Sequence, residues 1–174
     1  MVKVTSSKGG VRMLTVRELF ERLSWEEVKE CLVKLYPDQE GNLPGYEEVF
    51  EEVRSCSPLP NADGTVVHIE FREEDDGERW YDVYGRKPGG EWGYALELCL
   101  FREWAGFLVD PELIERMPLA EIAAHILYEM TFCGYSDEEI AARRREIEER
   151  VREYQEHPER AVPLGEVLDR VRRE

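Results

Sequence analysis

The feature that most constrains the fold is a β-hairpin pattern set between two helical stretches. Apolar and polar side chains alternate along Thr65–Arg72, and this two-residue period is typical of a half-buried strand. Asp76-Gly77 separates this run from a second β-rich run at Trp80–Tyr84, which is a hairpin signal. A third strand is predicted at Trp92–Phe101. The pattern therefore predicts a three-stranded antiparallel β-meander with one face on the helices and one more open to water.

Three amphipathic helices are predicted before the strands. Thr15 is followed three residues later by Glu18, and Ser24 by Glu27. Both pairs have the spacing of a capping box, which marks the first turn of a helix. A third helix is predicted to begin near Pro44.

Four more helices are predicted after the strands. A short one begins at Asp110-Pro111, because aspartate suits the cap and proline the first turn. The others are expected at Pro118–Cys133, at Ser136–Glu156 and from about Pro163. The predicted fold class is α+β, with N-terminal helices, a three-stranded antiparallel β-meander and C-terminal helices packed on the sheet.

The length of 174 residues suits one domain with a helical extension. We expect residues 1–14 to be a flexible arm and residues 15–135 to be a single α+β domain. Residues 136–174 are predicted to be a C-terminal helical extension packed on the same domain.

The chain is strongly acidic, with 39 acidic residues, 23 basic residues and a formal net charge of −16. Such a surface repels nucleic-acid phosphates and anionic lipid head groups, so direct binding to nucleic acid or membrane is not expected. It attracts basic surfaces, and we expect a protein partner, possibly a basic one. Solubility alone is the simpler explanation of the charge.

The cysteines and the hydropathy pattern predict a cytoplasmic protein. No apolar run approaches the length that spans a membrane. The cysteines form no CxxC pair, fit no zinc motif and are expected to be reduced thiols. No cofactor and no metal site are expected from these patterns. The four cysteines are Cys31, Cys56, Cys99 and Cys133.

The first candidate site is a strip on the helix at Pro118–Cys133. Glu121, His125 and Glu129 are spaced four residues apart and line up along the border of its apolar face. A histidine between two carboxylates could hold a divalent metal or serve as a general base. A structural histidine that bonds a neighbour is the commoner outcome, because the second histidine of HExxH is missing.

The second candidate site is the outward face of the sheet, where aromatic and acidic side chains are interleaved. Such a face is either a binding surface, solvated, or covered by C-terminal helices. A nearby match to a calcium loop has Leu59 where its first aspartate belongs, so we interpret it as a polar turn. The side chains of the outward face are His68, Glu70, Trp80, Asp82, Tyr84 and Glu97.

The third candidate is a narrow apolar stripe on the helix at Ser136–Glu156. Arginine and glutamate flank the stripe, so the helix either packs lightly on its own domain or forms a seam with a second copy. A homodimer is therefore possible through Ile140, Ile147, Val151 and Tyr154.

Two stretches carry a family resemblance: SWEEVKECLVKLYPDQEGNLPGYEEVFEEV at 24–53 and LAEIAAHILYEMTFCGYSDEEI at 119–140. Together they resemble an uncharacterised bacterial family, a domain of unknown function with "LYPDQ…GY" and "AH…EMTF.G" stretches. The likeness covers roughly residues 15–145 and leaves out the last 30 residues. It implies a bacterial cytoplasmic protein and brings no activity or catalytic residues.

The sequence favours a non-enzymatic function over catalysis. No nucleophile elbow, P-loop or dinucleotide motif is present, and the charge favours an acidic protein-interaction or regulatory module. Antitoxins, immunity proteins and nucleic-acid mimics are of this kind. One alternative is a small metal-dependent hydrolase that uses Glu121, His125 and Glu129, and another is a structural homodimer.

Overall fold

The computed structural model describes residues 13–90, 92–160, 163, 166 and 172. The chain divides into two compact units, Met1–Ser136 and Asp137–Glu174, and each is described by itself. The predicted arm falls almost wholly outside the described residues, as does most of the last predicted helix. The predicted packing of 136–174 on the rest stays a prediction.

The helices before the sheet begin where their capping residues predict. Thr15 and Ser24 each accept a hydrogen bond from the backbone three residues on, and Glu18 and Glu27 reach back to complete both capping boxes. The third helix begins one residue before Pro44. The elements are α1 (Val16–Glu21), α2 (Trp25–Leu35), the 3-10 helix η1 (Pro37–Asn42) and α3 (Leu43–Ser55).

The sheet has four strands in the order β3-β2-β1-β4. β1 and β2 form the predicted hairpin, and Gly77 in its turn has φ of 84°, which glycine adopts without strain. β3 adds antiparallel to β2, and β4 adds parallel to β1. The predicted meander therefore becomes a mixed sheet. The strands are β1 (Val66–Glu73), β2 (Arg79–Arg86), β3 (Gly93–Tyr94) and β4 (Leu108–Val109).

The predicted third strand is wrong beyond Tyr94. A strand through this segment would place Leu96 and Leu98 on one face, but Leu98 is exposed with φ of 66°, whereas Leu96 is buried. A helix replaces the end of the strand, because the Glu103 carboxylate accepts a hydrogen bond from the backbone N–H of Leu100 and fixes its first turn. That helix, α4 (Phe101–Gly106), feeds directly into β4.

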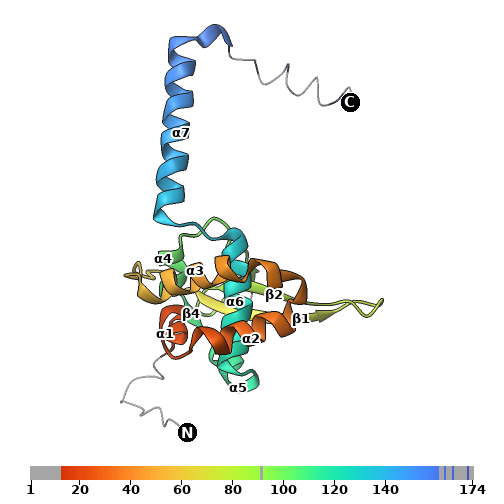
Figure 1. Ribbon diagram of the computed structural model, residues 1–174. Helices are drawn as coiled ribbons and strands as arrows, with labels where there is room; N and C mark the ends of the chain where they lie inside the picture. Colours follow the sequence, from red (N-terminus) through yellow and green to blue (C-terminus); the bar gives the residue numbers. More distant parts are fainter. Residues whose placement is uncertain (1–12, 91, 161–162, 164–165, 167–171, 173–174) are drawn as a thin grey trace. The chain divides into compact units, whose positions relative to one another are not determined.

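α6 forms the centre of the first unit, where it packs against α2, α3 and β2 (Figure 1). The predicted packing of a C-terminal helix on the sheet is thereby confirmed. Its predicted apolar stripe is buried apart from the half-buried Leu119. No described helix is long and apolar enough to cross a membrane. The remaining elements are α5 (Pro111–Arg116), α6 (Leu119–Cys133), α7 (Asp137–Glu156) and the 3-10 helix η2 (Pro158–Arg160).

Gly106 lies where the end of α4 touches the loop before β1, and a side chain is not tolerated there. A Cβ at this position would stand 2.5 Å from the carbonyl oxygen of Leu59. The backbone N–H of Leu59 donates to the carbonyl of Arg102 at 2.9 Å, so the two segments are tied together. We expect Gly106→Ala to lower the free energy of unfolding by about 1–3 kcal/mol, measured by denaturant titration.

Gly45→Ala is the matched control. Gly45 lies within α3, and a Cβ there meets nothing within 4 Å. Alanine is the better helix former, so this variant is expected to gain up to about 1 kcal/mol. Equal losses in the two variants would contradict the close contact at Gly106.

Candidate functional site

His125 lies in the core rather than at the border of its helix. Its side chain is fully buried, and its Nδ1 forms a hydrogen bond of 2.6 Å with the hydroxyl of Tyr36 at the end of α2. Its Nε2 has no hydrogen-bond partner among the described residues. The nearest acid, Glu121, places Oε1 3.9 Å from Nε2, which is too far for a hydrogen bond.

Aromatic rings surround His125 and keep its imidazole away from water. The Tyr81 ring of β2 lies 4.0 Å from the imidazole between centroids, and Tyr36 meets it edge-on at 5.7 Å. Tyr36 in turn stacks on Tyr128 at 3.9 Å. Burial lowers the pKa of His125 to about 4 and raises the pKa of Tyr36 well above its ordinary value. At neutral pH the imidazole is therefore neutral and belongs to the packing of α6.

The three side chains of the predicted strip do not converge on one point. Glu129 lies beside Cys133, whose thiol is 3.7 Å from its Oε1. Burial raises the pKa of Glu129, and the nearby Asp82 and Glu97 raise it further. Across the described residues, no group of three or more histidine, cysteine, aspartate or glutamate side chains is arranged to hold a metal ion. Metal binding by this strip was only the alternative interpretation, and it stays an alternative.

The outward sheet face is closed at one end and open at the other. His68 is buried, and its Nδ1 lies 2.6 Å from a carboxylate oxygen of Asp110, the residue that caps α5. At His68 the face is therefore covered, which is one of the outcomes that the sequence left open. Opposite it, the half-buried Tyr84 donates to Glu70 at 3.4 Å and accepts from Arg86 at 2.7 Å.

Residues 70–82, which we call the distal hairpin, form the open end. Every side chain from 70 to 80 is exposed, and Figure 1 shows this tip of β1 and β2 extending past the helices. Phe71 is 47% exposed on one face, and Trp80 is 45% exposed on the other. The alternation of β1 puts Phe71 on the same face as the buried Val67 and Ile69. Phe71 is nevertheless exposed, because β1 extends beyond the helices that cover this face, and alternation alone does not show where that happens.

The distal hairpin is also strongly acidic. It contains seven acidic and two basic side chains, a net charge of −5. Both arginines are paired: Arg72 lies 2.6 Å from Asp82, and Arg79 lies 3.6 Å from Glu73. Five carboxylates therefore surround the two exposed aromatic rings without a local counter-charge from these arginines. They belong to Glu70, Glu74, Asp75, Asp76 and Glu78.

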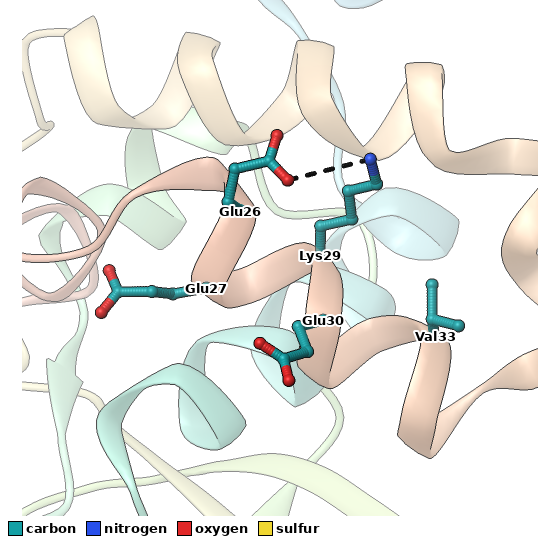
Figure 2. Close-up of a pocket in the computed structure, with 5 residues that line it drawn as sticks. All are labelled: Glu26, Glu27, Lys29, Glu30 and Val33. Carbon is teal, nitrogen blue, oxygen red and sulfur yellow. Dashed lines mark ion pairs between the residues drawn. The ribbon is translucent and has the colours of Figure 1, made fainter.

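Two further surface features hold no predicted site residue. A hollow on the outer side of α2 is lined by Glu26, Glu27, Lys29, Glu30 and Val33 (Figure 2). The ammonium group of Lys29 lies 3.9 Å from the Glu26 carboxylate.

In the loop of the calcium-like pattern, the Asn61 side-chain amide forms hydrogen bonds with both the backbone N–H and the carbonyl of Thr65 and closes a turn before β1. This agrees with a polar turn.

A family model for DUF6557, a family of unknown function, matches residues 17–172. The chain belongs to this family. The resemblance predicted from the sequence is thereby confirmed, but the prediction that it leaves out the last 30 residues is wrong. The DUF6557 match includes α7 as well as the distal hairpin and the surroundings of His125. No curated protein and no solved structure matches the chain.

The sequence identified the two histidines but not the residues that form hydrogen bonds with them. It singled out His125 and His68 but did not connect them to Tyr36 and Asp110. The chain separations are 89 residues for the first pair and 42 for the second, and no local pattern links positions so far apart. Asp110 had a local signal only for its second role, as the cap of α5.

Proposed function

We propose that the protein is a non-enzymatic interaction module that binds a basic surface of a partner protein through the distal hairpin. The observation that carries this proposal is the exposure of Phe71 and Trp80 on a projecting, acidic hairpin. Aromatic side chains in interfaces supply much of the binding energy when a partner excludes water from them. Phe71 and Trp80 lie on opposite faces of the two-stranded hairpin. A partner that encloses the hairpin from both sides therefore buries both side chains.

The charge of the hairpin indicates the chemistry of the partner. A local net charge of −5 within a chain of net charge −16 raises the encounter rate with a positively charged protein and repels an acidic one. Arg79 lies over the Phe71 ring at 5.9 Å, and Phe71 packs on Tyr81 at 5.3 Å. These contacts hold the Phe71 ring in place before binding, which lowers the entropic cost of association.

The first test removes the aromatic rings. The intact protein is used to capture partners from its host, and the affinity for the captured protein is then measured by calorimetry. We expect Phe71→Ser with Trp80→Ser to weaken binding at least about 30-fold, because two buried aromatic anchors are lost. Trp92→Ser is the control, since Trp92 is exposed outside the distal hairpin. Equal losses in both variants, with folding intact, would reject the hairpin as the interface.

The second test removes charge without removing bulk. Glu74→Gln, Asp75→Asn and Glu78→Gln neutralise three acids of the hairpin and leave Asp76, whose carboxylate accepts from the backbone of Glu78 in the turn. We expect slower association and a weaker salt dependence than in the wild type. The control triple Glu40→Gln, Glu47→Gln and Glu48→Gln changes net charge equally on η1 and α3. An equal effect of the two triples would show that only net charge matters.

Competition with nucleic acid separates the kinds of acidic module. An antitoxin, immunity protein or nucleic-acid mimic that covers a phosphate-binding surface is displaced when DNA or RNA competes for the same partner. A partner that is not displaced by nucleic acid uses a basic surface of another kind.

A further inference from the structure

α7 carries an apolar stripe that is mostly exposed to solvent. None of its residues is buried, and three large side chains of the stripe are exposed: Ile147 at 60%, Val151 at 48% and Tyr154 at 57%. The helix is 20 residues long. Most of the stability of a helix in a protein comes from packing of its apolar face, so packing of the stripe against another surface would stabilise α7.

The spacing of the stripe is that of a coiled coil. Ile140, Arg144, Ile147, Val151 and Tyr154 follow one another at intervals of four, three, four and three residues. This alternation places them along one seam of a helix, at successive core positions of the heptad repeat. Four of the five are apolar. We propose that α7 pairs with α7 of a second copy of this chain as a parallel, in-register, two-stranded coiled coil.

The flanking charges select a second copy and set its direction. Arg143 and Arg150 lie on one side of the seam, and Glu148 and Gln155 lie on the other. In a parallel pair each flanking residue meets the residue five positions later on the other helix. Arg143 then meets Glu148 of the second copy, and Arg150 meets Gln155. An antiparallel pair would instead bring the arginine flanks together, which is repulsive.

Arg144 is the one charged residue in the seam, and it limits the strength of the pairing. A polar residue at a core position lowers stability and favours two strands over larger bundles. Pro158 follows the helix in η2 and ends the seam. With two heptads available, we expect a reversible monomer–dimer equilibrium. The dimer would present two distal hairpins, but the coiled-coil proposal does not depend on what they bind.

Sedimentation equilibrium of the full chain tests the pairing. We expect a dimer whose dissociation constant rises at least tenfold with Ile147→Asp, because a charge enters the seam. Ala142→Asp is the matched control: it adds the same charge on the outer face of the same helix and should change dissociation less than about twofold. A wild-type chain that stays monomeric up to about 1 mM, or equal effects of the two variants, would overturn the proposal.

Charge exchange and cross-linking test the direction. Glu148→Arg is expected to weaken the dimer by about tenfold, and adding Arg143→Glu to restore it. Tyr154→Cys should form a disulfide-linked dimer under mild oxidation, because a parallel register places position 154 beside itself. The wild-type chain with its native cysteines is the background control. Cross-linking only between mixed Ile140→Cys and Tyr154→Cys chains would show an antiparallel pair and overturn the proposed arrangement.

Discussion

Acidification from pH 7 to pH 4 is expected to lower the free energy of unfolding by roughly 3 kcal/mol through His125 alone. Burial lowers the pKa of His125 from 6.5 to about 4 in the fold, and each pKa unit corresponds to about 1.4 kcal/mol. The folded protein therefore favours the neutral imidazole, while the unfolded chain takes up a proton near pH 6.5. This contribution to stability is complete above pH 6.5 and is lost as the pH falls toward 4.

Denaturant titrations across this pH range isolate the effect when wild type is compared with His125→Phe. The variant has no imidazole to protonate, so its stability should fall less steeply between pH 6.5 and 4. Glu129 acts in the opposite direction, because burial raises its pKa, but its contribution is common to both proteins and cancels in the difference. His157→Phe is the control, since the His157 side chain is 46% exposed and lies outside the core. Parallel curves for wild type and His125→Phe would contradict the buried, neutral state of His125.

The helices that could be predicted from the sequence are those whose signals are local. Thr15 and Ser24 fix the starts of α1 and α2 through hydrogen bonds that span three residues, and Asp110 caps α5 through a bond to the backbone two residues on. These bonds join residues that are close in the chain, so a local sequence pattern is enough to predict them. The apolar period of α6 was equally informative, because seven of its residues are buried.

The errors lie where distant contacts decide between two local structures. The 92–101 segment alternates like a strand, but only Gly93–Tyr94 pairs with β2. Farther on, the backbone of Leu98 donates to the carbonyl of Cys133, and Phe101 donates to Tyr135. Contact with the end of α6 therefore replaces strand pairing. The prediction that His125 lies at the border of its helix failed for a similar reason. Tyr36 and Tyr81 contact it from two other elements and bury it.

α4, the helix that the sequence did not predict, contains Trp104, the largest fully buried side chain of the described core. α4 contacts both α1 and α3, and Trp104 packs on Phe107 at 5.7 Å between ring centroids. Trp104→Ala would leave a cavity where these three helices meet. We expect a loss of about 3–5 kcal/mol in the free energy of unfolding, measured by denaturant titration. Trp92→Ala, at an exposed tryptophan, is expected to change it by less than about 0.5 kcal/mol.

Trp104→Phe separates the packing of the indole from its polarity. The Nε1 atom of Trp104 is buried and has no hydrogen-bond partner among the described residues. Phenylalanine keeps most of the ring contacts and removes this unsatisfied donor, whose burial carries a cost of its own. Removing the unsatisfied donor stabilises the fold and offsets part of the stability that is lost with the smaller ring. We therefore expect Trp104→Phe to lower the free energy of unfolding by less than about 2 kcal/mol. A loss as large as that of Trp104→Ala would mean that the indole N–H is bonded in solution and that α4 is held by a polar contact as well as by packing.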